Sequence, residues 1–481
     1  MRVFLVAVSL LLASSADAQQ ASQTSQFVRE NSPAIALAHV ELIDGTGAAA
    51  QQDQTIVLDH GKIVAVGPAA STAVPTGAKV IDAKGKTVIP GLVGMHEHLF
   101  YGAANDGEPI FIEQPFSFPQ LYLASGVTTA RTTGSIEPYT DLQVKARVDS
   151  GKLPGPELYL SSPYVEGAPS AFLQMRPLKD ADEARAFVDY WHSVGFTSVK
   201  AYIDVKSDEL RAAIEQSHKL GMKVTGHICS VGYIEAANMG IDNLEHGPFI
   251  APDGELLSHK KPGLCGDGQG NFLAVLKDMA TNTEADGPKL RETTETLVAH
   301  HVALTSTLAV VEGGHGQALS SGLMKRSREL MSLATWSHVM TNRVAAIEFE
   351  SLLETLLRKE MKFERNFVAA GGTLLAGCDP TGNGMTLAGL GDQRQVELLV
   401  EAGFTPAEAI RIATQNGAAF LGIADRVGSI AVGKQADLVL LEGDLSKDIT
   451  AIEKPEIVFK NGVGYDSNAI YESLRGQVGL Q

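Results

Sequence analysis

The sequence has few cysteines, no excess of basic residues, and no long apolar run beyond its N-terminal region. It contains only Cys229, Cys265 and Cys378 in 481 residues, so a framework of disulfides does not hold this fold together. The formal net charge is −17, which argues against a nucleic-acid partner and an acidic membrane surface, because both would repel the chain. No later segment reaches the ~20 apolar residues of a transmembrane helix. These absences favour an ordinary globular protein without a nucleic-acid partner or an acidic membrane surface.

The N-terminus has the layout of a secretory signal peptide. A basic Arg2 is followed by an apolar run from Val3 to Ala13 and then by the small residues Ala16 and Ala18. The apolar run is too short for a permanent transmembrane helix, and the small residues are typical of a cleavage site. We therefore expect cleavage after Ala18 and export of the mature protein to the periplasm or the medium.

The sequence pattern predicts short strands at the two ends of the chain and a different kind of structure between them. Residues 34–88 and roughly the last sixty residues contain short apolar runs separated by Gly-rich turns, including an Asn461-Gly462 hairpin signal. This pattern predicts a small β-sandwich domain built from residues 19–88 and 425–481. Residues 1–18 would be the signal peptide, and residues 89–424 a separate domain.

The middle of the chain alternates apolar strand-like segments with helical ones. Several of the strand-like segments are continuous β-branched or apolar runs, which is typical of parallel strands buried on both faces. The last helical segment, residues 404–422, begins with Thr405, Pro406 and Glu408, which form a capping box with proline at the first helical position. Eight strand segments alternating with helices predict an α/β fold of the (β/α)8 TIM-barrel class. The strand segments are residues 88–96, 126–134, 157–165, 197–204, 223–230, 241–247, 302–311 and 372–380.

Residues 251–299 interrupt this rhythm between the sixth and seventh strands. Long insertions at this end of a barrel usually sit over the active-site face, so the segment is a candidate lid or pocket wall. The alternative is a surface loop without a role in the site.

Metal-ligating side chains recur at the ends of the predicted strands. The carboxyl ends of barrel strands converge on one face, where the active site of a TIM barrel lies. We therefore expect these residues to be neighbours in space although they are far apart in sequence. They are His96, His98, Lys200, His227, His246 and Asp379.

His96 and His98 are the strongest single signal. Residues two apart on a strand point to the same side, so both imidazoles can bind one ion. Glu97 then points to the barrel wall and is expected to be structural. A lone histidine near an apolar strand is more often a hydrogen-bonded core or surface residue, and only the combination with the other strand ends makes the metal site convincing.

Lys200 is unusual in such a cluster. Burial and a neighbouring cation both disfavour the ammonium form and leave a neutral amine, which can react with CO2 to form a carbamate. The carbamate is an anionic group with two oxygens, able to bridge two metal ions. The alternative is an ion pair between Lys200 and an acid such as Asp204.

With these residues in place, the chain resembles the metal-dependent amidohydrolase superfamily. The motifs "VIPGLVGMHEHL", "SVKAY", "GHICS", "NLEHG" and "AGCDPTG" are similar to those of its exported branch of prolidase-type and other dipeptide-cleaving hydrolases. Residues 391–414 are also shared with imidazolonepropionase-like members. The resemblance implies that His96, His98 and Asp379 hold a more buried ion and that His227 and His246 hold a more exposed one. A carboxylated Lys200 would bridge two divalent ions, most simply Zn²⁺.

This resemblance implies hydrolysis of an amide bond in a peptide, such as a dipeptide, or in an N-acyl amino acid. The attacking group would be a hydroxide that bridges the two ions. Asp379 would accept its proton and return it to the leaving amine. Tyr202 would donate a hydrogen bond to the developing oxyanion, unless it is only a packed barrel aromatic. Arg131 and His315 are the candidates for holding a substrate carboxylate.

Other functions remain open at this point. The same site would serve a lactone or ester hydrolase, whereas a mononuclear deaminase or imidazolonepropionase-like cyclic-amide hydrolase generally lacks the bridging lysine. A non-catalytic scaffold on this barrel is disfavoured because all six candidate ligands are present. Barrels of this kind often form homo-oligomers, but no segment of the sequence marks an interface.

Overall fold

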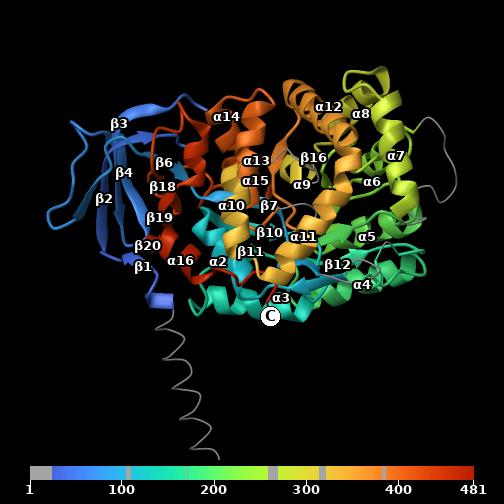
Figure 1. The fold of residues 1–481 in the computed structure, drawn as a ribbon, viewed down its shortest axis with the longest axis horizontal. Coiled ribbons are helices and arrows are strands. Elements are labelled where there is room, and N and C mark those ends of the chain that lie inside the picture. Colours follow the sequence, from blue (N-terminus) through green and yellow to red (C-terminus); the bar gives the residue numbers. More distant parts are fainter. Residues whose placement is uncertain are drawn as a thin grey trace, which may run out of the picture.

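The computed structural model describes residues 24–103, 110–170, 172–257, 269–313, 321–381 and 386–480. Figure 1 shows a sheet domain on the left, built from the N-terminal and C-terminal segments, beside a larger α/β part. The predicted signal peptide, residues 1–18, lies outside the described residues. Within the described ranges, no helix combines the length and the apolar character needed to cross a membrane.

The sheet domain combines strands from both ends of the chain in one nine-stranded sheet. The strand order is β1-β20-β19-β18-β6-β2-β3-β4, and β5 pairs with β2 beside this path. Because β18 pairs with both β6 and β19, the N-terminal and C-terminal strands meet in the middle of the sheet. The strands are β1 (Val28–Glu30), β2 (Ala34–Leu42), β3 (Gln51–Asp59), β4 (Lys62–Pro68), β5 (Lys79–Asp82), β6 (Thr87–Pro90), β18 (Leu438–Leu441), β19 (Pro455–Lys460) and β20 (Val463–Asp466).

Two predictions from the sequence concern this domain: the hairpin turn at Asn461-Gly462 and the boundary after residue 88. Asn461 and Gly462 connect β19 to β20 with φ angles of 52° and 80°, as a two-residue hairpin turn of type I′ requires. The predicted boundary between residues 88 and 89 falls inside β6, which leads almost directly into the first barrel strand. The sheet has an apolar core of its own, which includes Ile35, Leu37, Ile56, Leu438 and Phe459.

The larger part is a barrel of parallel strands that alternate with helices, as the sequence predicts. β10 pairs with β7 and β11, and β12 to β17 pair in sequence order. β11 and β12 flank Leu160 and together form the third strand of the barrel. Most residues of these strands are buried, which explains their continuous apolar composition. The strands are β7 (Leu92–Glu97), β10 (Val127–Thr132), β11 (Glu157–Tyr159), β12 (Ser161–Val165), β13 (Ser198–Ala201), β14 (Lys223–Gly226), β15 (Asn243–Glu245), β16 (Ala303–Ser306) and β17 (Leu374–Ala376).

The first and last barrel strands meet beside His96. The backbone N–H of Asp379 donates a hydrogen bond to the carbonyl oxygen of His96 over 3.0 Å. A Cβ at Gly377 would overlap the backbone of His96. Glycine at this position therefore permits the close approach that brings Asp379 to the end of β7.

Helices follow most of the barrel strands, and two of them show how the sequence sets their boundaries. The Asp180 side chain accepts a hydrogen bond from the backbone N–H of Glu183 and begins α4. Thr405 and Glu408 form the predicted capping box at the start of the last barrel helix. The helices are α2 (Ser117–Ala124), α3 (Pro138–Asp149), α4 (Ala181–Ser193), α5 (Ser207–Lys219), α6 (Tyr233–Met239), α8 (Pro288–Ala299), α12 (Glu350–Ala369), α13 (Leu390–Glu401), α14 (Pro406–Arg411), η2 (Ile412–Asn416) and α15 (Gly417–Phe420).

Further elements extend the barrel. The insertion predicted at residues 251–299 contains α7, which lies at the right of Figure 1 together with α8, but residues 258–268 are outside the described ranges. Its role as a lid stays a prediction. The sequence did not mark the hairpin after β7 or the helices that follow β16. These elements are β8 (Phe100–Ala103), β9 (Ile110–Glu113), α7 (Gln269–Asn282), α9 (Leu308–Gly313), α10 (Ser321–Leu330), α11 (Leu333–Ala346), η1 (Ile347–Phe349), and near the C-terminus η3 (Ile449–Glu453) and α16 (Ser467–Ser473).

Candidate active site

The predicted metal ligands all lie at the carboxyl ends of barrel strands. Their side chains come from five different strands and are largely removed from solvent. They lie in or shortly after β7, β13, β14, β15 and β17: His96, His98, Lys200, His227, His246 and Asp379.

His96, His98 and Asp379 form the tightest group. Asp379 Oδ1 lies 3.6 Å from His96 Nε2 and 3.3 Å from His98 Nε2. Two atoms that bind one tetrahedral zinc ion at ~2.1 Å are ~3.4 Å apart, so these separations suit a shared ion. The three side chains offer ligand atoms that all lie within 4.8 Å of one another.

His246 and His227 continue the site on the other side of His96. The ring centroid of His246 lies 4.4 Å from that of His96 and 4.6 Å from that of His227. Asp379 Oδ2 is 4.0 Å from His246 Nδ1, so the Asp379 carboxylate faces both groups of histidines. His246 Nδ1 also lies 2.7 Å from the hydroxyl of Thr307, a partner that the sequence analysis did not identify.

Two of these residues have unusual backbone conformations. His246 has φ of 68° and Asp379 has φ of 52°, in the left-handed region that residues other than glycine rarely adopt. Hydrogen bonds from the backbone N–H of His246 to Thr305 and from that of Asp379 to His96 hold them there. Such strain, about 1–3 kcal/mol per residue, is concentrated at functional sites because the surrounding structure must maintain it.

Lys200 is buried in this cluster. The residue is 1% exposed, and its Nζ has no hydrogen-bond partner among the residues that the structure describes. Burial lowers the pKa of Lys200 to about 8, against an opposing effect of the Glu245 charge. The alternative ion pair with Asp204 is therefore not formed, and a reactive neutral amine is accessible at moderately alkaline pH.

The electrostatics of the histidines fit metal ligation. Burial and, after it, the charge of Lys200 together lower the pKa of His227 to about 3. Burial is also the largest cause that holds the pKa values of His96 and His246 well below the usual range. These imidazoles are neutral near pH 7, as coordination to a metal requires.

Several buried polar atoms at this site have no hydrogen-bond partner among the described residues. They are Nδ1 of His98, Nζ of Lys200, Nε2 of His227 and Oδ1 of Asp379. A buried donor or acceptor without a partner costs about 1–3 kcal/mol, so four of them at one site call for a missing group. Imidazole nitrogen and carboxylate oxygen are ligands that zinc prefers. The residues present therefore fit a metal centre.

Glu245 contacts one of the candidate ligands and orients it. The Glu245 carboxylate is fully buried, and its Oε2 lies 2.8 Å from Nδ1 of His96, which leaves Nε2 of His96 directed at Asp379. Burial alone would raise the pKa of Glu245, but the charges of Arg131 and Lys200 lower it below its usual value. A carboxylate on the outer nitrogen of a ligating histidine fixes the ring orientation. The sequence alone does not indicate this role for Glu245.

Arg131 is placed differently from its predicted role. Its side chain is 1% exposed and donates hydrogen bonds to the carbonyl oxygen of Met95, to Asn243 Oδ1 and to Glu245 Oε1, the last over 2.7 Å. All of these partners belong to the protein. The contacts of Arg131 thus support the barrel interior and the orientation of Glu245, and they do not hold out a guanidinium for a substrate carboxylate.

A second buried group lies behind β7. Glu97 points away from the two histidines, as expected, and accepts hydrogen bonds from the Cys378 thiol over 3.1 Å and from its backbone N–H over 3.3 Å. Burial and, after it, the charge of Asp392 raise the pKa of Glu97 well above its usual value, and burial raises the pKa of Asp392 to about 6. This group joins β7 to the segment that carries Asp379, and the structural role expected for Glu97 stays a prediction.

The remaining predicted residues have mixed outcomes. The Tyr202 ring lies 5.1 Å from the ring of His227 and 4.9 Å from that of Tyr164, so it borders the cluster. Burial raises the pKa of Tyr202, which keeps its hydroxyl protonated and able to donate. His315 lies outside the described residues, and its predicted substrate contact stays a prediction.

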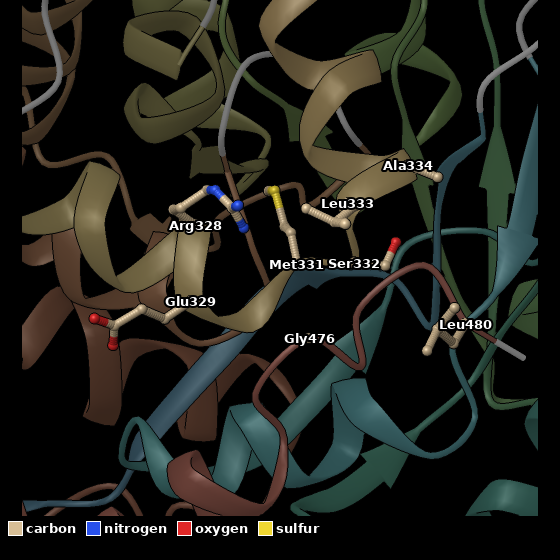
Figure 2. Close-up of a pocket in the computed structure, with 8 residues that line it drawn as sticks. All are labelled: Arg328, Glu329, Met331, Ser332, Leu333, Ala334, Gly476 and Leu480. Carbon is tan, nitrogen blue, oxygen red and sulfur yellow. The ribbon is translucent and has the colours of Figure 1, made fainter.

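A pocket of about 680 Å³ is lined by residues other than the candidate metal ligands. Its lining includes Arg328, Met331 and Leu333 around the junction of α10 and α11, and Leu480 near the C-terminus (Figure 2). None of its lining residues is a candidate ligand or proton-transfer group of the cluster.

Comparisons with known proteins identify the family of this chain. The model of the Amidohydrolase family matches residues 87–463. Imidazolonepropionase of Sphingopyxis alaskensis is 24% identical over 400 residues, which cover 81% of this chain and 86% of that protein. Imidazolonepropionase of Stenotrophomonas maltophilia is 33% identical over 102 residues, but this match covers only 21% of the chain and 25% of that protein.

Solved structures share the fold at low sequence identity. A Xaa-Pro dipeptidase with bound methionine has a TM-score of 0.66 at 19% identity, covering 90% of this chain and 100% of that one. A bottromycin amidohydrolase has a TM-score of 0.67 at 18% identity, covering 95% of each chain. The family match spans most of the chain and includes every candidate ligand. The chain therefore belongs to the amidohydrolase family, as the sequence motifs predicted, and is a metal-dependent hydrolase of carbon–nitrogen bonds.

Proposed function

We propose that this chain is an exported hydrolase with two metal ions that cleaves an amide bond in a peptide or an N-acyl amino acid. The observation that carries the proposal is Lys200, a buried amine without a partner among the candidate ligands. Its charge acts on His96, His227, His246 and Asp379, which shows that it lies within electrostatic reach of both groups of ligands.

Lys200 has the chemistry of a bridging ligand. A pKa of about 8 leaves a substantial neutral fraction near pH 7 to 8. The neutral Nζ attacks CO2, a nitrogen–carbon bond forms, one proton is released, and the product is a carbamate with two oxygens. His96, His98 and Asp379 would then hold one ion, His227 and His246 the other, and the carbamate would hold both.

The ions, when bound, supply Lewis acidity that lowers the pKa of water toward neutrality and polarises the scissile carbonyl. Asp379 faces both groups of histidines, so its carboxylate is placed to accept a proton from the attacking water and return it to the leaving amine. Tyr202 borders His227 and remains protonated, so its hydroxyl is a candidate donor to the developing oxyanion.

Metal content and one substitution test this proposal. Elemental analysis of the purified mature protein, reloaded with zinc and bicarbonate, should give two equivalents per chain. Asp379→Asn should retain metal while turnover of dipeptides and N-acyl amino acids falls by about two orders of magnitude or more. Turnover retained in Asp379→Asn would remove Asp379 from proton transfer. Protein that binds no metal after reloading would contradict the metal centre itself.

A cyclic-amide hydrolase with one metal ion is the second candidate, favoured by the match to Sphingopyxis imidazolonepropionase over 81% of this chain. One equivalent of metal, together with full activity in Lys200→Met, would support it. Lactones and simple esters belong in the same substrate screen, because the same groups can act on those carbonyls. We propose to screen linear dipeptides first, because a Xaa-Pro dipeptidase is among the solved structures that share this fold.

Export rests on Arg2, the apolar residues 3–13 and the small residues before position 19. N-terminal sequencing of protein recovered outside the cytoplasm should begin at Gln19. A chain that retains Met1 and stays in the cytoplasmic fraction would contradict export.

A further inference from the structure

A series of aromatic rings borders the candidate metal centre. Starting at His98, the ring centroids of successive partners are 4.3 Å to Phe100, 5.1 Å from there to Phe111, and 5.3 Å from there to Phe172. Phe172 is 6.1 Å from Tyr202, whose ring in turn lies 5.1 Å from that of His227. The series therefore begins and ends at candidate ligands. We call Phe100, Phe111, Phe172 and Tyr202 the aromatic wall.

One ring of the aromatic wall is buried, and the other three are partly exposed. Phe100 is 2% exposed and packs against His98, whereas Phe111, Phe172 and Tyr202 are partly exposed. Aromatic side chains normally bury most of their apolar surface. These three aromatic side chains lie along the series beside the candidate metal centre, and part of their apolar surface stays exposed. That exposed surface is available to a ligand.

Hydrogen bonds fix the wall in position. The Gln174 side chain accepts a hydrogen bond from the backbone N–H of Phe111 over 2.8 Å and donates one to the carbonyl oxygen of Phe111 over 3.0 Å. Ser170 donates to the carbonyl oxygens of Phe172 and Met175 over 2.9 and 2.7 Å. These contacts join the β8–β9 hairpin to the segment after β12. The backbone at Phe111 and Phe172 is therefore held in place before a substrate arrives, which lowers the entropic cost of binding.

We propose that the aromatic wall binds a large apolar, preferably aromatic, side chain of the substrate next to the scissile amide. The inference deepens the proposed function, since it names the substrate class of the same site and rests on that site binding an amide. Arg131 supports the inference indirectly, because its donors are directed at protein groups and do not supply a counter-ion for a charged substrate side chain. Offset or edge-on contacts at 4.5–7 Å are favourable between aromatic rings, so a phenyl group would extend the series.

Two probes with the same backbone test the proposal: N-acetyl-phenylalanine amide and N-acetyl-alanine amide. Their Kd values are measured by calorimetry on zinc-loaded Asp379→Asn, which should bind without turnover. We expect the phenylalanine probe to bind at least about tenfold more tightly, which corresponds to 1.4 kcal/mol. Phe111→Ala and Phe172→Ala, each in the same background, should reduce the ratio to within about threefold. Phe172→Leu should retain part of the preference for the phenylalanine probe.

Phe187→Ala is the matched control. Phe187 is a partly exposed phenylalanine on α4 that packs against Trp191, and it takes no part in the wall. Its substitution should leave the ratio unchanged. Equal Kd values for the two probes in Asp379→Asn, no binding of either probe, or an equal loss in Phe187→Ala would overturn the proposal.

Wild-type kinetics separate this proposal from the proposed function. If zinc-loaded wild type hydrolyses a set of amides, its kcat/KM should favour aromatic substrates over alanine substrates, and Phe111→Ala should reduce that preference. If wild type hydrolyses no amide but the difference in Kd persists, amide hydrolysis is wrong and the aromatic wall stands. If amides are hydrolysed without any preference for aromatic side chains, the aromatic wall is wrong and the proposed function stands.

Discussion

Replacing Glu245 by glutamine is the sharpest test of how this centre is held. The substitution keeps the shape of the side chain and removes one buried negative charge. In the wild type that charge pairs with Arg131 over 2.7 Å and lies 2.8 Å from Nδ1 of His96. Glu245→Gln therefore perturbs an ion pair and the orientation of a candidate ligand with a single change.

The expected magnitude follows from the contacts that remain. Removing one partner of a buried ion pair typically costs 3–5 kcal/mol, because the other charge is left buried without compensation. Arg131 keeps neutral acceptors at Met95 and Asn243, and the glutamine oxygen can still accept, so we place the loss at the lower end, about 3 kcal/mol. Loss of the carboxylate behind a ligating histidine typically lowers metal affinity about 10–100-fold.

Two measurements separate these effects. Guanidinium unfolding of metal-free protein gives the free energy of unfolding, and competition with a chromogenic chelator gives the zinc affinity. Glu209→Gln is the control: Glu209 is equally buried and lies 3.0 Å from the Lys206 ammonium at the start of α5, away from the site. The control should lose stability but keep wild-type zinc affinity.

The double variant Arg131→Met/Glu245→Gln should be more stable than Glu245→Gln alone, because it removes the uncompensated charge. Its zinc affinity should remain low, since His96 still lacks its carboxylate partner. Wild-type zinc affinity in Glu245→Gln would refute the role of Glu245 in orienting His96. A wild-type free energy of unfolding in the same variant would refute the dependence of Arg131 on that charge.

Three further predictions address the rest of the structure. Burial holds the pKa of His227 at about 3 in the metal-free fold against 6.5 when unfolded, so the unfolded chain binds the extra proton below pH 6.5. The free energy of unfolding should therefore fall by about 1.4 kcal/mol per pH unit as the pH is lowered from 6.5 toward 3. Denaturant titrations at several pH values should show a weaker dependence of this free energy on pH in His227→Asn. The same pH dependence in the variant and the wild type would count against the low pKa of His227. Gly377→Ala should cost about 1–3 kcal/mol and reduce zinc affinity by moving Asp379 from His96, and unchanged affinity would mean that the strands accommodate the methyl group. Thr405→Ala should cost about 1 kcal/mol in thermal or chemical unfolding without altering zinc affinity, and no loss would show that the capping box is dispensable.

Much of the architecture could be predicted because it depends on local composition and on periodicity. Continuous apolar runs marked the parallel strands, and Thr405 with Glu408 marked the start of a helix. Once a barrel was inferred, its geometry alone placed His96, His227 and Asp379 on one face. The candidate metal site was therefore accessible from sequence as a consequence of strand order.

The partners of individual side chains were not accessible in the same way. Arg131 and Glu245 are 114 positions apart, and their contact depends on the register of strands that are not adjacent in sequence. The sequence suggested a role in substrate binding for Arg131, whereas the packed barrel directs its guanidinium inward. A polar side chain at a strand end can satisfy its hydrogen bonds with protein or with substrate, and only the packed neighbours decide between them.

The sequence by itself determined that this chain forms a barrel of the amidohydrolase family, with six candidate ligands at the strand ends. Tertiary structure decided which atoms remain without partners, that His246 and Asp379 adopt left-handed conformations, and that Phe111, Phe172 and Tyr202 converge beside the centre. The physical reason is that composition and period act over a few residues. Burial, strain and ring contacts arise only when segments far apart in the sequence pack against one another.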